Sequence, residues 1–244
     1  MRDLVLLHGG QHGSWCWEPL LKVFAETAPA FERVITLDMP GCGCKRSRDP
    51  TGLTLADIAR ELNDELRDQG VTQAVLLGHS IAGVVLPLMA VQAPALFSHL
   101  VYLTTAIPLE RQTIMQMLGT SQHGANSDHV GWPVDIASTS PEALALAMFG
   151  RDLDKSQLDW LLREASQEQT PPATQFEPAS RAGYAELGIP ATFILTVRDD
   201  ILPVEWQRRF AERLGCTKII EIDTPHEPFV SHPQLLAEAL RPIR

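Results

Sequence analysis

Long apolar runs are missing from this sequence. No stretch approaches the roughly 18 apolar residues that a membrane-spanning helix requires, although 45% of the 244 residues are hydrophobic. The chain starts Met-Arg-Asp and enters a short apolar run at once, without the basic region, long apolar region and cleavage site of a secretory signal. We therefore expect a cytoplasmic protein that does not associate with a membrane.

Positive charge is also scarce. The chain has 20 Lys and Arg residues against 30 Asp and Glu residues, a formal net charge of -10. Because the phosphates of nucleic acids attract a basic surface, this balance argues against a nucleic-acid partner. The length and the hydrophobic content suit one large globular domain with a full core. A homodimer is compatible with the sequence, which does not set the oligomeric state.

Cysteine is rare, with only four residues, which are scattered as Cys16, Cys42, Cys44 and Cys216. Cys42 and Cys44 flank a single glycine, which is not a zinc-binding spacing, and no matching Cys or His pair occurs elsewhere. We interpret these residues as reduced thiols, with a redox or metal role as the alternative. The sequence thus predicts neither a metal site nor a cofactor.

Short apolar segments alternate with amphipathic helical segments over most of the chain. Such alternation predicts an α/β fold with a mostly parallel sheet and helices on both of its faces. The expected strands are residues 3–7, 33–37, 74–77, 100–103, 191–197 and 218–222. The expected helices are residues 15–28, capped by Ser14, and 54–69, capped by Thr54, followed by 81–92, 203–214 and 232–240.

The alternation stops between about residues 107 and 184. Two helical stretches stand out there, at 141–149 and about 155–167, among Gly, Ser, Thr, Asn and Pro. A structureless loop of this length is uncommon in a compact domain, so we expect a helical cap. The predicted organisation is a core of residues 1–106 and 185–244, with residues 107–184 inserted as the cap.

A serine lies in a tight turn directly after the third predicted strand. The sequence Gly78-His79-Ser80-Ile81-Ala82 follows an apolar run and precedes a helical segment. This pattern is typical of a nucleophile elbow, in which small residues two places either side of the serine let strand and helix pass closely. Ala82 stands where the last glycine usually lies. The alternative is an ordinary strand-to-helix turn with an incidental serine.

A base and an acid for this serine follow two later strands. His226 comes after the sixth strand and Asp199 after the fifth. The carboxyl ends of parallel strands meet at one edge of the sheet, so Ser80, Asp199 and His226 are expected to converge there. A serine hydroxyl needs such a base, and the base needs an orienting acid. Asp200 and Glu110 are rivals for the acid.

Acyl transfer also needs donors for an oxyanion. The backbone N–H of Ile81 lies at the start of the expected helix, where the helix dipole favours negative charge. The glycine-rich loop His8-Gly9-Gly10 after the first strand is expected to supply the second donor, at Gly10. Its alternative is an ordinary glycine turn.

Over almost its whole length the chain resembles the α/β-hydrolases of the plant methylesterase and hydroxynitrile lyase group and their bacterial esterase relatives. The resemblance is carried by residues 6–17, 38–41, 78–82, 198–199, 202–203, 207, 225–226 and 233. It implies an α/β-hydrolase fold with a mostly parallel six-stranded sheet, an acid at Asp199, and oxyanion donors at Gly10 and Ile81.

Two positions depart from the lyases of this group, which carry threonine after the first histidine and lysine after the catalytic one. Here these places hold Gly9 and Glu227. A lyase needs a cation beside the departing cyanide, so Glu227 favours hydrolysis. The leading hypothesis is a cofactor-free serine hydrolase acting on a small carboxylic ester. A lyase and a small-molecule receptor on the same scaffold are the alternatives.

Several residues near the predicted site are candidates for substrate contact. Some flank the catalytic loops, and others are apolar residues of the cap segment. They are Gln11, His12, His79, Trp132, Phe149 and Trp160. Each of the aromatic residues has cap packing as its alternative, and His12 and His79 have a structural role as theirs.

Overall fold

The computed structural model describes residues 1–28 and 30–243. In this part of the chain, one sheet has the strand order β2-β1-β3-β4-β5-β6, with every pair parallel. The strands are β1 (Leu4–Leu7), β2 (Val34–Leu37), β3 (Ala74–His79), β4 (Phe97–Leu103), β5 (Ala191–Thr196) and β6 (Lys218–Ile222). The α/β fold class expected from the sequence is confirmed.

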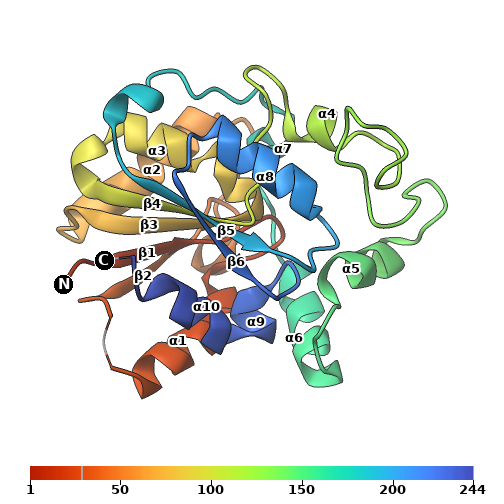
Figure 1. Ribbon diagram of the computed structural model, residues 1–244, viewed down its shortest axis with the longest axis horizontal. Coiled ribbons are helices and arrows are strands. Elements are labelled where there is room, and N and C mark those ends of the chain that lie inside the picture. Colours follow the sequence, from red (N-terminus) through yellow and green to blue (C-terminus); the bar gives the residue numbers. More distant parts are fainter. Residues whose placement is uncertain (29, 244) are drawn as a thin grey trace.

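Helices cover both faces of the sheet, as Figure 1 shows. On one face lie α1 (Glu18–Glu26) and α10 (Pro233–Leu240), and on the other α2 (Leu55–Asp68), α3 (Leu86–Gln92) and α8 (Val204–Arg213). Strands β1, β3 and β5 are therefore buried at every residue. Burial on both faces explains why these strands are continuous apolar runs rather than alternating ones. No helix among the described residues has the length and apolar character needed to cross a bilayer.

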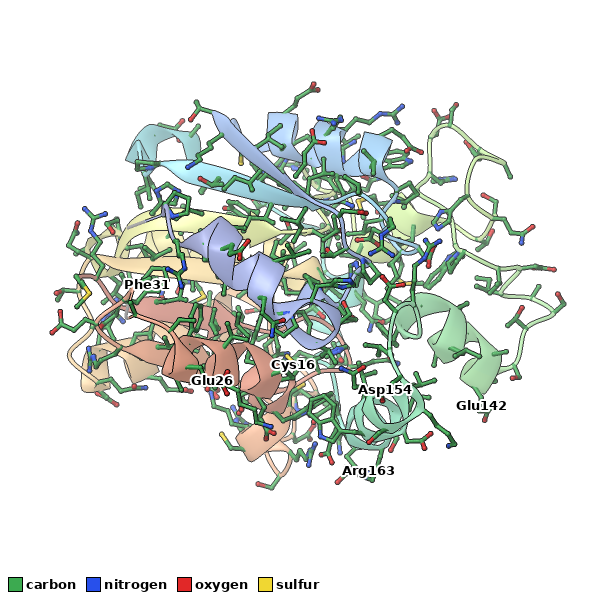
Figure 2. The ribbon with its side chains drawn as sticks, turned by 60° about the horizontal axis from the view of Figure 1, so that its bottom comes forward. Cys16, Glu26, Phe31, Glu142, Asp154 and Arg163 are labelled. Atoms are coloured by element: carbon green, nitrogen blue, oxygen red, sulfur yellow. The ribbon has the colours of Figure 1, made fainter. Side chains whose placement is uncertain are left out.

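The segment between β4 and β5 has no strand among its described residues, although an isolated β-bridge joins Gln122 and Trp132. Its helices are α4 (Ile114–Leu118), α5 (Pro141–Phe149), α6 (Lys155–Ala165) and α7 (Ala173–Phe176). Figure 1 shows α4, α5 and α6 at one end of the molecule, beyond the sheet. In Figure 2, Glu142, Asp154 and Arg163 of this segment lie at the end opposite Phe31. The two expected helices match α5 and α6, while the division into core and cap at residues 107 and 184 stays a prediction.

Two expected helix starts are wrong in detail. Ser14 does not cap a helix, because its N–H and hydroxyl both donate to Asp38, at 2.5 and 2.9 Å. A 3₁₀ turn fills Ser14–Trp17 instead, and α1 begins at Glu18. After the elbow, another 3₁₀ turn spans Ser80–Val84 before α3. Pro87 has no N–H to donate to the carbonyl of Gly83, which interrupts a regular α-helix at this point.

Candidate active site

Ser80 lies at the tip of β3 in a strained turn. Its φ is +53°, in the left-handed region that non-glycine residues seldom adopt. The turn brings strand and following helix so close that a Cβ on Gly78 would lie 2.4 Å from Leu86 and 3.1 Å from Ala82. The methyl of Ala82 thus fits only because residue 78 is glycine. The departure from glycine at position 82 leaves the elbow geometry intact.

The three side chains singled out after β3, β5 and β6 meet at one edge of the sheet. The Ser80 hydroxyl lies 3.0 Å from Nε2 of His226, and Nδ1 of His226 lies 2.7 Å from Oδ2 of Asp199. His226 and Asp199 are buried. The two rival acids lie elsewhere: Asp200 pairs with Arg151 at the surface, and Glu110 accepts the N–H of Arg181. Asp199 is therefore the carboxylate behind the imidazole.

Several donors converge on the Asp199 carboxylate. Oδ2 accepts the hydroxyls of Thr104 and Thr196 at 2.5 and 2.9 Å, and Oδ1 accepts the N–H groups of Ile201 and Leu202 at 2.8 Å. Burial alone would raise the pKa of Asp199, but the charge of His226 and these hydrogen bonds lower it. Asp199 is thus held ionised in a fixed orientation.

His226 has the opposite balance. Burial alone would lower the pKa of His226, but the charge of Asp199 and its hydrogen bond outweigh burial, so the pKa is raised. With Asp199 accepting from Nδ1–H, the neutral imidazole presents the lone pair of Nε2 to the Ser80 hydroxyl. This is the arrangement in which an imidazole removes a proton from a serine.

The loop after β1 lies against the elbow. A Cβ on Gly9 would lie 2.7 Å from Nδ1 of His79 and 3.0 Å from Cβ of Ser80, so no larger residue fits there. The loop is fastened by His8, whose Nδ1–H donates to the Gly9 carbonyl at 2.7 Å while Nε2 accepts the N–H of Met39 at 3.0 Å. Burial lowers the pKa of His8 to about 4, so it serves as a neutral donor and acceptor.

Gly10 and Ile81 border the same space as Ser80. A Cβ on Gly10 would lie 3.6 Å from the Ile81 side chain. Among the hydrogen bonds of the described residues, none uses the N–H of Gly10. The N–H of Gly10 therefore has no partner among the described residues, and its role as an oxyanion donor stays a prediction.

A cavity of about 290 Å³ opens above Ser80. Its lining combines the two loops just described with apolar side chains of the inserted segment. The lining residues are Gly10, Gln11, Ser80, Ile81, Ala106, Ile114, Met115, Leu118, Trp132, Leu144, Met148, Phe149, Gln175, Ile201 and Leu202. Three of the sequence candidates for substrate contact, Gln11, Trp132 and Phe149, lie here.

The other three candidates lie away from this cavity, and we correct the expectation for them. His12 is buried beneath the loop, with Nδ1 2.7 Å from the Gly10 carbonyl. His79 is buried behind the elbow, where its ring lies 3.0 Å from the carbonyl of His226 and burial lowers its pKa to about 3. Trp160 packs edge-on against Trp15 in a surface depression between α1 and α6. In each case the position along the chain indicated nearness to the site, but not the direction of the side chain.

Several contacts at the site were missed from the sequence. Thr104 directly follows β4 and Thr196 ends the neighbouring β5, so their place at the common edge was a signal that could have been used. Gln207 binds the backbone of Thr196 through both ends of its amide, at 3.0 Å each. The position of Glu227 beside His12 gave no signal, because 215 positions separate the two residues along the chain, and only the fold brings them together.

His79, His226 and Glu227 form the cluster whose donor atoms could approach one metal ion, lying within 4.8 Å of one another. Both ring nitrogens of His226 are already used by Asp199 and Ser80. A metal ion there would need His226 to give up one of these bonds. The arrangement is thus organised around proton transfer at Ser80.

Comparison with known proteins shows the family of the chain. Residues 4–239 match the model of the alpha/beta hydrolase family. Methylesterase 9 of Arabidopsis thaliana is 26% identical over 262 residues, covering 100% of this chain and 98% of that protein. The pyrethroid hydrolase of Sphingobium wenxiniae is 26% identical over 257 residues, covering 98% of this chain and 86% of that protein.

Solved structures show the same fold. An extracellular alpha/beta-hydrolase from a Paenibacillus species superposes with a TM-score of 0.77 at 19% identity, over 98% of both chains. Polyneuridine aldehyde esterase superposes with a TM-score of 0.73 at 22% identity, over 100% of this chain and 99% of that one. With a matching family model over nearly its full length and this arrangement of elbow, imidazole and carboxylate, the chain belongs to the alpha/beta hydrolase family.

Proposed function

We propose that this protein is a serine hydrolase that cleaves small carboxylic esters through an acyl-enzyme intermediate. The observation that carries the proposal is the hydrogen-bonded series Ser80–His226–Asp199, which faces a cavity large enough for a small ester. The named relatives, a methylesterase and a pyrethroid hydrolase, support ester hydrolysis as the reaction class.

The geometry supports a two-step reaction. His226 takes the proton of Ser80 as the hydroxyl oxygen attacks the ester carbonyl carbon, and the backbone N–H groups of Gly10 and Ile81 stabilise the resulting oxyanion. Collapse of this intermediate breaks the bond to the alcohol, which leaves with the proton from His226. Water then attacks the acyl group by the same route, releasing the acid and restoring Ser80. Asp199 stays ionised throughout and stabilises the imidazolium.

The cavity lining favours uncharged, largely apolar substrates. No Lys, Arg, Asp, Glu or His lines it among the described residues, and its polar side chains are those of Gln11, Gln175 and Ser80. A charged group placed there would lose its hydration without gaining a counter-ion, which is costly. Esters whose acyl and alcohol parts are both neutral and apolar are therefore the proposed substrate class.

The test compares Ser80→Ala with the wild type on p-nitrophenyl acetate and on a panel of esters that differ in acyl and alcohol size. Multiple turnovers by the wild type and their loss in Ser80→Ala are expected. Ser98→Ala, at the opposite end of the sheet, is the matched control and keeps full activity. Turnover that persists in Ser80→Ala would refute the proposal.

A fluorophosphonate probe separates the alternatives. Labelling of Ser80 together with turnover supports the hydrolase. Labelling without multiple turnovers of any ester in the panel would favour a receptor. Release of cyanide from a cyanohydrin, abolished in Ser80→Ala, would favour a lyase instead.

A further inference from the structure

One peptide group of the loop after β1 is bound at both of its ends. It joins Gly10 to Gln11, directly after the free N–H of Gly10. We propose that His12 with Glu227 and, from the inserted segment, Thr170 are positioning residues that clamp this peptide and so hold the oxyanion donor of Gly10 in place. The inference rests on the proposed hydrolase function, because it assigns the clamp a role in stabilising the oxyanion.

The carbonyl end of the peptide is held by His12. Nδ1–H of His12 donates to the Gly10 carbonyl at 2.7 Å, which fixes the direction of that oxygen. On the other side of the ring, Nε2 lies 3.3 Å from Oε2 of Glu227. Both side chains are almost fully buried, at 1% and 2% exposure, so water cannot replace either contact.

The pair requires His12 to carry a proton on both nitrogens. Nδ1–H donates to a carbonyl and Nε2 lies beside a carboxylate, which places the ring next to a negative charge as an imidazolium. Burial alone would lower the pKa of His12, but the charge of Glu227 raises it. Conversely, burial alone would raise the pKa of Glu227, but His12 and His79 lower it to about 2. The pair is therefore an ion pair inside the protein.

Glu227 has no other evident reason to be buried. Neither of its carboxylate oxygens has a hydrogen bond of good geometry, and neither does Nε2 of His12. Burying a carboxylate without a compensating charge is strongly unfavourable, so a buried Glu227 next to His226 requires an interaction that offsets this free-energy cost. The contact with His12, and through it with the Gly10 carbonyl, is the feature of this position that serves the reaction.

The N–H end of the same peptide is held by Thr170. The N–H of Gln11 donates to the Thr170 hydroxyl at 2.7 Å. Gln11 has a φ of +59°, an unfavourable conformation for a residue with a side chain, and this bond helps to hold it there. Thr170 is itself anchored, because the N–H of Gln169 donates to the Gly41 carbonyl at 2.9 Å.

The clamp is needed because the loop contains two consecutive glycines, Gly9 and Gly10. Gly9 and Gly10 lack side chains that would restrict rotation, so Gly10 can adopt either sign of φ at little cost. Donors stabilise an oxyanion best when they are oriented beforehand. Fixing both ends of the Gly10–Gln11 peptide limits rotation on the carboxyl side of Gly10. The inserted segment thereby helps to orient the Gly10 N–H, in addition to lining the cavity above Ser80.

The first experiment removes the Thr170 hydroxyl. Thr170→Val keeps the shape but loses the acceptor, and Thr170→Ser restores the acceptor. We expect kcat on p-nitrophenyl acetate to fall about tenfold in Thr170→Val. Removal of an oxyanion donor lowers kcat about 10²- to 10³-fold, and a Gly10 N–H that is only less well oriented should lower it less. KM stays within about twofold, and Thr170→Ser recovers most of kcat. An unchanged kcat, or an equal loss in both variants, would overturn the role of Thr170.

The second experiment addresses the ion pair. Glu227→Gln removes the charge that keeps His12 doubly protonated, and kcat is expected to fall about tenfold at every pH tested. Glu227 raises and His12 lowers the pKa of His226, so the loss of the two charges acts on the acid limb of the pH profile in opposite directions. A shifted acid limb with an unchanged plateau would show electrostatic tuning of His226 and overturn the clamp.

The controls keep the outcomes distinct. If Glu227→Gln does not fold, as judged by thermal melting, the Thr170 variants decide the question. Binding of a trifluoromethyl ketone, which forms an oxyanion on Ser80, should weaken in parallel with kcat in each variant. If Ser80→Ala keeps activity, the hydrolase proposal itself fails. If Ser80→Ala is inactive while Thr170→Val and Glu227→Gln behave as wild type, the clamp alone fails.

Discussion

At the scale of single residues, the Asp199 carboxylate is the point on which most hydrogen bonds of the site converge. In Asp199→Asn, the amide nitrogen would face donors from Thr104, Thr196 or the backbone, and His226 would lose the charge that fixes its tautomer. We expect kcat to fall about 10³- to 10⁴-fold, with the fold retained. Steady-state kinetics and circular dichroism test this.

Asp200→Asn is the matched control for that variant. Asp200 pairs with Arg151 at the surface, where such pairs contribute at most about 1 kcal/mol. The kcat of Asp200→Asn should therefore stay near that of the wild type. A larger loss of activity in Asp200→Asn than in Asp199→Asn would mean that Asp200, and not Asp199, is the acid.

The raised pKa of His226 sets the pH dependence. Only the neutral imidazole can accept the serine proton, so kcat/KM should increase with pH as His226 deprotonates. Because Asp199 raises its pKa, the apparent pKa of this acid limb should lie above the usual histidine value of 6.5. Rates from pH 5 to 9 measure it. An apparent pKa below 6.5 for this acid limb would contradict the presence of an ionised Asp199 beside His226.

At the scale of elements, local sequence signals were reliable where no distant partner competed for them. Thr54 was expected to cap α2, and its hydroxyl accepts the N–H of Asp57 while Asp57 accepts the N–H of Thr54. Ser14 carried the same type of signal, but Asp38, 24 residues away, takes both of its donors. The sequence alone could not show that contact, because it depends on how β1 and β2 pair.

The Thr54 cap predicts a change in stability without a change in catalysis. Thr54→Ala leaves an N–H of the first turn of α2 without its acceptor, so the free energy of unfolding should fall by about 1 kcal/mol. Urea denaturation measures this, and kcat should be unchanged. Thr51→Ala, in the exposed loop before the helix, is the control and should have little effect. Equal losses in both variants would mean that the cap contributes nothing specific.

At the scale of the whole molecule, the fold class was predictable because the period of apolar residues reports burial directly. The convergence of Ser80, Asp199 and His226 followed from parallel strands ending at one edge, although their catalytic roles stay predictions. The direction of His12, His79 and Trp160 was not predictable, since it depends on packing between segments far apart in the sequence. The same holds for the path of the inserted segment, which has no strand to fix it.

Glu168 ties that segment to the loops that follow β1 and β2. Glu168 accepts hydrogen bonds from Nε1 of Trp15 and the N–H of Gly43, each at 2.8 Å, and pairs with Arg46 at 2.6 Å. Its carboxylate is fully buried, so water cannot take over as acceptor. In Glu168→Gln one oxygen becomes an amide group that cannot accept, which leaves a buried donor unpaired. The free energy of unfolding should fall by about 1–3 kcal/mol.

Limited proteolysis and urea denaturation of Glu168→Gln should therefore show faster cleavage within residues 107–184 and a lower transition midpoint. Glu164→Gln is the matched control, because Glu164 also pairs with Arg46, at 3.0 Å, but is more exposed. That variant should lose less than about 1 kcal/mol. Since Thr170 follows Glu168 by two residues, the loosened segment should also lower kcat in Glu168→Gln while leaving Glu164→Gln unaffected. A destabilised Glu168→Gln with normal kcat would mean that the segment and the loop of Gly10 move independently.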